Sequence, residues 1–297
     1  MACGQAESGT IRQLIAKVLA LAIVVSGACY AIVEFTPYLR LFGHERVLYI
    51  ALHRAQQKFP EAKVVVLGDS VCCQLYKPNS YRKEIVSLAS NYGVSLLGQR
   101  ILMDIWLEHN SDAGPQDIAL VVNPESFRNS LNETFTYGYV IKPFWCPEWR
   151  NRFDDVESRR IKAFRFYWLS QFPYVRISDW CPSEIPSFAQ EPHFKECHLS
   201  QISIYELKKM EESARRHGVR LHILAGVVRE STRTRDFGVF KRQIKEGNLE
   251  ALFSEYFPSA KYLPDQLFLD DVRARIHLKD PEALGRDALG LLKLAGR

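Results

Sequence analysis

Length, composition and charge place this chain among folded proteins and exclude several classes. It has 297 residues, of which 47% are hydrophobic and 25% charged, so it can bury the core of one substantial α/β domain and is neither disordered nor of low complexity. The formal net charge of +5 is too small for a nucleic-acid-binding surface and indicates only a weak attraction to anionic lipids or glycans. We therefore expect no nucleic-acid partner.

The first part of the chain has the composition of a membrane anchor. Residues 14–33 supply about the twenty apolar positions that a spanning helix needs, with no charge after Lys17. Arg12 and Lys17 precede the uncharged residues 18–33, which predicts a cytoplasmic N-terminus and an extracytoplasmic remainder, periplasmic in a Gram-negative bacterium. Two alternatives stay open. One is a signal peptide cleaved after Ser26-Gly27-Ala28, and the other is the core helix of a soluble protein.

After this segment the chain divides into a connector and a domain. We expect residues 1–35 to form a cytoplasmic tip and anchor, 36–60 a connector with a helix, and 61–297 an α/β domain. Within that domain, β-branched runs alternate with amphipathic ones. The predicted strands are 63–68, 84–89, 117–123, 220–225 and one near 261–263, and the predicted helices cover 96–107, 200–217 and a terminal segment that begins at Asp280-Pro281. This order predicts a parallel sheet covered on both faces, with reactive groups at the carboxyl ends of its strands.

A segment rich in aromatic residues and arginine interrupts the domain at about residues 130–199. Aromatic faces beside hydrogen-bonding side chains suit sugar rings, and arginines suit phosphate or carboxylate groups. The alternative is an insertion that builds a small core of its own with a charged, solvated face.

The seven cysteines follow no metal-binding spacing. The chain has no P-loop, no dinucleotide-binding glycine motif and no His-Glu-x-x-His, so we expect neither metal nor cofactor. Cys146, Cys181 and Cys197 could supply one disulfide in an oxidising compartment. Cys72 or Cys73 is an alternative nucleophile, because the N-terminus of a helix lowers the pKa of a thiol.

The candidate for chemistry is Ser70. The run 63–67, which is apolar from Val64 on, indicates a buried strand, and Gly68-Asp69-Ser70 follows it as a turn that leads into a helix. Backbone N–H groups at the start of such a helix can hold an oxyanion, although Gly-Asp-Ser is also ordinary turn chemistry. A serine nucleophile needs a base, and His277 follows the last predicted strand beside Asp270 and Asp271.

These blocks resemble, in content and order, those of SGNH (GDSL-type) hydrolases. The resemblance covers about residues 62–290 and is carried by Val66–Ser70, Asn91–Ser95, Asn123 and the acidic segment before His277. With its N-terminal anchor, the chain looks most like the membrane-tethered, extracytoplasmic branch, which includes proteins of alginate acetylation and teichoic-acid D-alanylation. The resemblance implies a flavodoxin-like three-layer α/β/α sandwich and O-acyl transfer or hydrolysis without metal.

Transferred to this chain, the family pattern implies Ser70 as nucleophile and His277 as base. Ala274 stands where the family has its acid, so Asp271 or Asp270 would orient His277. The oxyanion would be held by the N–H of Ser70, by the loop that contains Gly93 and Gly98, and by Asn123.

The expected function is a membrane-anchored serine O-acyltransferase or esterase that acts outside the cytoplasm. Its expected substrate is an O-acyl group, acetyl in the simplest case, on a cell-envelope glycan or polymer. The alternative is a non-catalytic accessory protein that binds a glycan or a multispan membrane acyltransferase, and Ala274 is its main support. The transmembrane segment could assemble with such an acyltransferase in either case.

Overall fold

The structure is a computed structural model that describes most of the α/β domain and the N-terminal helix. The described residues are 3–36, 46–77, 83–91, 93–110, 117–122, 124–128, 130–131, 137–144, 149–164, 167–170, 198–226, 228–229, 238–255 and 262–263.

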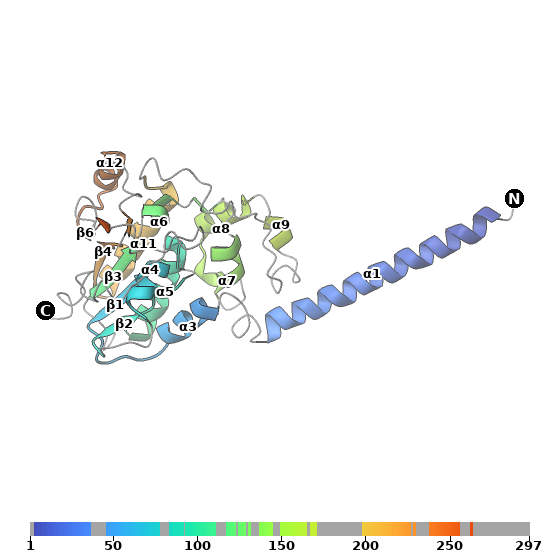
Figure 1. The fold of residues 1–297 in the computed structure, drawn as a ribbon, viewed down its shortest axis with the longest axis horizontal. Coiled ribbons are helices and arrows are strands. Elements are labelled where there is room, and N and C mark those ends of the chain that lie inside the picture. Colours follow the sequence, from blue (N-terminus) through green and yellow to red (C-terminus); the bar gives the residue numbers. More distant parts are fainter. Residues whose placement is uncertain are drawn as a thin grey trace.

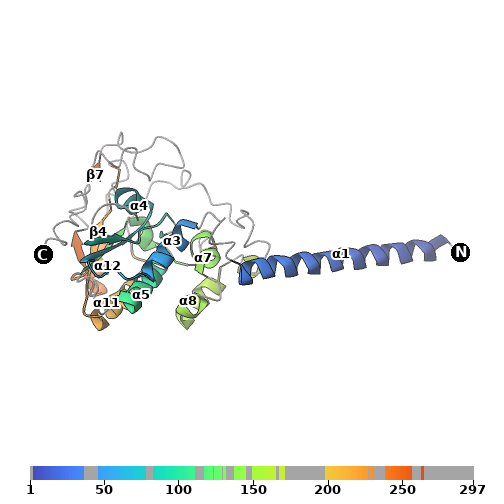
Figure 2. The same ribbon diagram turned by 90° about the horizontal axis from the view of Figure 1, so that it is seen from below.

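The N-terminal helix α1 (Cys3–Phe35) projects from the domain as a single rod (Figures 1 and 2). Its apolar stretch, Thr10–Ile32, has 23 residues and a mean hydropathy of 2.2, which is long and apolar enough to cross a membrane. Its large apolar side chains are exposed, for example Ile23 at 72% and Val24 at 66%. The core-helix alternative therefore does not describe α1, whereas a membrane anchor and a signal sequence both have these properties.

Five parallel strands form the main sheet, in the order β2-β1-β3-β4-β6. Their bounds are Ile85–Ser87, Val64–Gly68, Asp117–Val122, Arg220–Ala225 and Phe253–Glu255. In the centre of the sheet, Gly68 pairs with Val121, and Val121 pairs with Leu224. The predicted parallel α/β architecture is confirmed, and β4 has the predicted bounds.

The predicted strand near 261–263 belongs to a different sheet. It is β7 (Tyr262–Leu263), which pairs with β5 (Val228–Arg229) in a two-stranded parallel sheet. The last strand of the main sheet is β6, which the sequence analysis missed. It has only three residues and no β-branched run, and its pairing with β4 is irregular between Ile223 and Leu224.

Alternate residues of the strands pack on opposite faces of the sheet. Val65 and Leu67 belong to the larger core, with α3 (Arg46–Ala55), α5 (Leu96–Asn110) and α11 (Gln201–Arg216). Val64 and Val66 pack against α4 (Ser70–Leu75). Figure 2 shows α4 on one side of the sheet and α3, α5 and α11 on the other. The helix expected in the connector is thus α3, and its apolar side chains are part of the domain core.

The described part of the predicted insertion also contributes to this core. The helix α6 (Pro124–Arg128) lies just before it. The described part of the insertion contains the π-helix η1 (Tyr137–Ile141), α7 (Lys142–Phe144), the 3-10 helix η2 (Arg150–Arg152), α8 (Asp155–Lys162) and α9 (Tyr167–Ser170). Phe144, Trp149 and Phe164 are buried in the same cluster as the sheet. These three aromatic rings are therefore neither an exposed sugar platform nor a separate core.

The helix before β4 ends as the sequence predicts. α11 ends at Arg216, and Gly218 has a φ of +69°, a left-handed conformation that glycine adopts without steric cost. At its other end the Ser200 side chain accepts a hydrogen bond from the N–H of Ser203. The last described helix, α12 (Gly238–Glu246), precedes β6.

Candidate functional site

Ser70 is the first residue of α4, directly after the turn that follows β1. The carboxylate of Asp69 caps this helix, because its Oδ1 accepts hydrogen bonds from the N–H groups of Val71 at 3.0 Å and Cys72 at 3.3 Å. The N–H of Cys73 donates to the Asp69 carbonyl oxygen at 2.9 Å. The amides that follow Ser70 in the first turn are therefore occupied.

Ser70 itself has two polar groups that bind no described residue. It is 6% exposed, and neither its hydroxyl nor its N–H makes a hydrogen bond to any described residue. A hydroxyl and a backbone amide of one residue thus share a position at the carboxyl end of β1. In a serine enzyme, such a hydroxyl is the nucleophile and such an N–H is the first donor to the oxyanion.

The position of Ser70 in the sheet is the one where α/β proteins most often bind ligands. The chain passes from β1 outward to β2 and then returns across β1 to β3, so the connections after β1 and β3 leave in opposite directions. The carboxyl ends of two such neighbouring strands border a crevice at the topological switch point. Ser70 follows β1, and Asn123 directly follows Val122, the last residue of β3.

A buried glutamine links the β1 turn to the segment after β2. The Nε2 of Gln99, on α5, donates to the carbonyl oxygens of Gly68 at 2.9 Å and Gly93 at 2.5 Å. Ser90 completes the contact, because its N–H donates to Gly68 O at 3.1 Å and its carbonyl accepts from Gly93 N–H at 2.8 Å. Sequence reasoning missed Gln99, since its only signal is a polar residue after the two leucines and the glycine that begin the helix.

Gly93 is required by this arrangement. A Cβ at this position would lie 2.1 Å from Gln99 Nε2 and 2.6 Å from Gly68 O, closer than any real contact. Gly98 has a similar but weaker restriction, because a Cβ there would lie 3.1 Å from both a ring carbon of Phe144 and Ser95 Oγ.

The amides of these two glycines are engaged in the structure. Gly93 N–H donates to Ser90 O at 2.8 Å, and Gly98 N–H donates to Ser95 Oγ at 3.1 Å. The oxyanion role that we assign to them from the sequence stays a prediction, and it would require these bonds to open.

The two neighbouring thiols have the wrong electrostatics for a nucleophile. Burial raises the pKa of Cys72 well above its ordinary value, and the nearby Asp69 carboxylate raises it further. Burial and Asp69 also raise the pKa of Cys73. Both shifts are opposite to the lowering expected at the N-terminus of a helix, so the thiols are mostly protonated at neutral pH.

The proposed base and acids, His277, Asp271 and Asp270, and the oxyanion candidate Asn123 lie outside the described residues. The described part of the chain does contain one Asp–His pair, in which His222 Nε2 lies 2.6 Å from Asp117 Oδ1. Asp117 begins β3, four positions before the Val121 that pairs with Gly68. This pair is therefore about 13 Å along the strand from the level of the Ser70 turn, near the amino ends of the strands, whereas Ser70 follows a carboxyl end.

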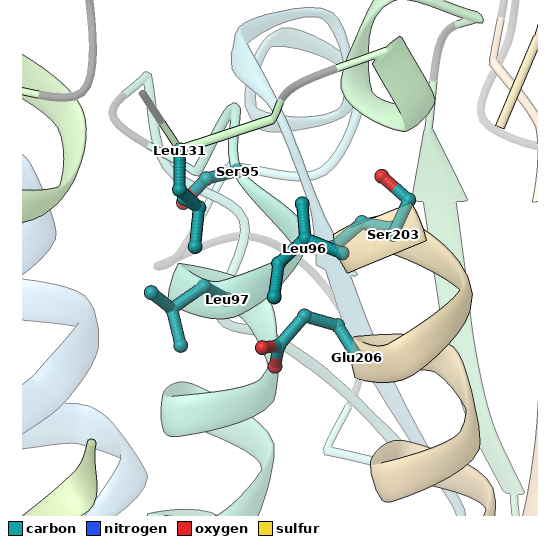
Figure 3. Close-up of a pocket in the computed structure, with 7 residues that line it drawn as sticks. Ser95, Leu96, Leu97, Leu131, Ser203 and Glu206 are labelled. Carbon is teal, nitrogen blue, oxygen red and sulfur yellow. The ribbon is translucent and has the colours of Figure 1, made fainter. Parts of the chain in front are cut away.

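A small cavity lies between the first turns of α5 and α11 (Figure 3). It is lined by Ser95, Leu96, Leu97, Leu131, Ile202, Ser203 and Glu206, and it has room for about one water molecule. Glu206 accepts from Arg100 Nε through Oε2 at 2.7 Å, while its Oε1 has no hydrogen-bond partner among the described residues. The cavity is too small for an acyl substrate. Within the described segments, no three His, Cys, Asp or Glu side chains lie close enough together to hold a metal ion.

No protein-family model matches this chain, and no curated protein or solved structure matches it either. The family resemblance therefore rests on the sequence blocks alone.

Proposed function

We propose that the chain is a membrane-anchored serine O-acyltransferase or esterase of SGNH type, acting outside the cytoplasm on O-acyl groups of a cell-envelope glycan or polymer. The observation that carries the proposal is the place of Ser70 directly after the carboxyl end of β1, an interior strand of the sheet, where its hydroxyl and amide make no hydrogen bond to any described residue.

The architecture is consistent with this proposal. The strand order β2-β1-β3-β4-β6 is the order of a flavodoxin-like doubly wound sheet, with helices on both faces. A three-layer sandwich of this kind gathers its reactive groups where Ser70 and Asn123 follow their strands.

In the proposed reaction, Ser70 Oγ attacks the acyl carbonyl carbon while His277 takes the hydroxyl proton. The Ser70 N–H and the side chain of Asn123 stabilise the oxyanion, and Asp271 or Asp270 orients His277. Collapse of the tetrahedral intermediate expels the leaving alcohol, which receives the proton from His277. A water molecule or a sugar hydroxyl then gives its proton to His277 and attacks the acyl-enzyme carbonyl. As this second intermediate collapses, the bond to Ser70 Oγ breaks, and His277 returns the proton to Ser70 Oγ.

The anchor and the partners follow from α1. Arg12 and Lys17 lie at the N-terminal end of the apolar stretch, before its uncharged part, and favour a cytoplasmic N-terminus, so the domain would face the envelope polymer. A multispan membrane acyltransferase is the partner that could supply an acyl group beside α1.

The test is labelling of the purified full-length protein with a fluorophosphonate probe, together with hydrolysis of p-nitrophenyl acetate. We expect the wild type to be labelled and active and Ser70→Ala to lose both properties. Ser87→Ala, which removes a buried hydroxyl from the neighbouring strand β2, is the matched control and should keep them. His277→Ala should reduce the rates of labelling and hydrolysis. Asp271→Asn and Asp270→Asn are compared, and the variant with the larger loss identifies the acid that orients His277. An unlabelled wild type would reject serine catalysis and favour the non-catalytic accessory protein.

A further inference from the structure

Gln99 joins two segments that are far apart in sequence, and it does so next to Ser70. Its side chain is fully buried, and its Nε2 donates to Gly68 O, two residues before Ser70, and to Gly93 O, in the segment after β2. Together with the Ser90 bonds to Gly68 and Gly93, this contact is called the Gln99 bridge below.

The orientation of the amide follows from its partners. Both partners are carbonyl oxygens, which only accept hydrogen bonds, so the NH₂ group must face them and Oε1 must point away. Oε1 then has no hydrogen-bond partner among the described residues. A buried polar atom without a partner is unfavourable, and its presence here indicates that the two Nε2 bonds are what the position requires.

The surrounding residues accommodate the bridge. Gly93 has no Cβ, and one at that position would overlap both Gln99 Nε2 and Gly68 O. The backbone at Gly68, the backbone at Gly93 and the Gln99 side chain are thus in direct contact. No other residue type at position 93 would allow this contact.

We propose that Gln99 is a positioning residue of the Ser70 centre. By holding Ser90 and Gly93 against the turn at 68–70, it keeps a constant separation between the Ser70 hydroxyl and amide and the described groups that follow β2. The inference rests on the proposed serine chemistry, which depends on such separations because a displacement of about 1 Å can slow a reaction about 100-fold.

The chain contains a matched control on the same helix. Asn110 is also a buried amide, with Nδ2 donating to Gln57 O at 3.0 Å and Trp106 O at 3.3 Å, while its Oδ1 accepts from Phe59 N–H at 3.0 Å. It lies eleven positions after Gln99, about 16 Å along the helix. Removing its hydrogen bonds should loosen the fold without touching the Ser70 turn.

The experiment compares Gln99→Met with Asn110→Leu, both close to the native side chains in size and both lacking the amide. In the full-length protein, we expect Gln99→Met to slow fluorophosphonate labelling of Ser70 about 10- to 100-fold per folded molecule. With p-nitrophenyl acetate, kcat should fall while KM changes little. Asn110→Leu should label at nearly the wild-type rate even where its melting temperature is lower. If Gln99→Met does not fold, Gln99→Asn, which keeps the amide but is one methylene group shorter, should show the same slower labelling.

Equal labelling of the Gln99 and Asn110 variants, with an active wild type, would overturn the positioning role. An unlabelled wild type would instead reject the serine chemistry. In that case amide hydrogen exchange decides on the bridge itself: faster exchange at Ser90 and Gly93 in Gln99→Met than in Asn110→Leu would support it, and equal exchange would refute it.

Discussion

At the scale of single residues, Gly93 shows that a glycine can meet a steric requirement that is separate from its predicted role as an oxyanion donor. The sequence suggests a glycine that offers its N–H to an oxyanion. In the structure this N–H donates to Ser90 O, and the missing Cβ is what allows Gln99 and Gly68 to approach. Close backbone approach is a common reason for a glycine, and it cannot be distinguished from an amide role by sequence position.

Gly93→Ala should therefore destabilise the domain. The new methyl group would force Gln99 or the 68–70 turn to move, which typically lowers the free energy of unfolding by about 1–3 kcal/mol. Gly138→Ala is the control, because no described atom lies within 4 Å of a Cβ at that position. Chemical denaturation followed by circular dichroism measures the difference, and equal stability of the two variants would contradict the steric argument.

Ser70 and Gln99 differ in how far the sequence alone predicts their roles. Ser70 could be predicted because its signal is local, a buried strand followed by a small polar turn. Gln99 could not, because its partner Gly68 lies 31 positions earlier in the chain and only the folded structure brings the two together.

At the scale of elements, α5, α8 and α11 are held together by a buried cluster of charges. Arg100 bonds to Glu206, Asp104 and Glu157, and Lys209 bonds to Glu157. Burial raises the pKa of Glu206 to about 8, while Arg100 opposes the rise and the Glu157 carboxylate adds to it. Glu206 is therefore largely protonated in the folded protein at neutral pH.

This protonation makes stability depend on pH with a definite sign. The pKa of Glu206 is about 8 in the folded protein against a reference of 4.5, so the folded state holds a proton that the unfolded state has lost between these values. The stabilising contribution is complete below about pH 4.5 and decreases as pH rises toward 8, with a slope of at most about 1.4 kcal/mol per pH unit.

Glu206→Gln should remove this part of the pH dependence. The control is Glu212→Gln on the same helix, where the carboxylate is 57% exposed and should leave the slope unchanged. Denaturation curves between pH 5 and pH 8 give the comparison. A slope that Glu206→Gln does not alter would show that Glu206 is ionised in the folded protein across this range.

Elements differ in how well the sequence predicts them. β1, β3 and β4 carry continuous apolar runs, and the predicted strands overlap the observed ones closely. β6 has three residues, and only its pairing with β4 makes it part of the sheet. A strand defined by its neighbour rather than by its own residues has no periodic signal to detect.

At the scale of the whole molecule, the structure combines a folded domain with an exposed apolar rod (Figure 1). The rod could be predicted from composition alone, because membrane spanning depends on length and hydropathy. The role of the aromatic segment could not, because burial of Phe144, Trp149 and Phe164 depends on the helices that cover them.

Removal of residues 1–36 should convert a membrane-bound protein into a soluble one. Full-length protein should stay in the membrane pellet after carbonate extraction, whereas the chain that begins at residue 37 should appear in the supernatant, because α3 and the sheet retain their shared core. Intact mass should show that the mature full-length protein keeps residues 1–35. Release of the full-length protein, or loss of its first residues, would contradict the anchor.

The Asp69 cap also has a consequence for the charge of whatever approaches the rim of the sheet. Loops that cradle phosphoryl groups offer several free amides in succession, but here a carboxylate has already taken two of them and leaves a negative charge beside Ser70. A dianion meets repulsion at this turn, while an uncharged ester meets a single open donor. We therefore expect this turn to favour neutral electrophiles over nucleotides and phosphate esters.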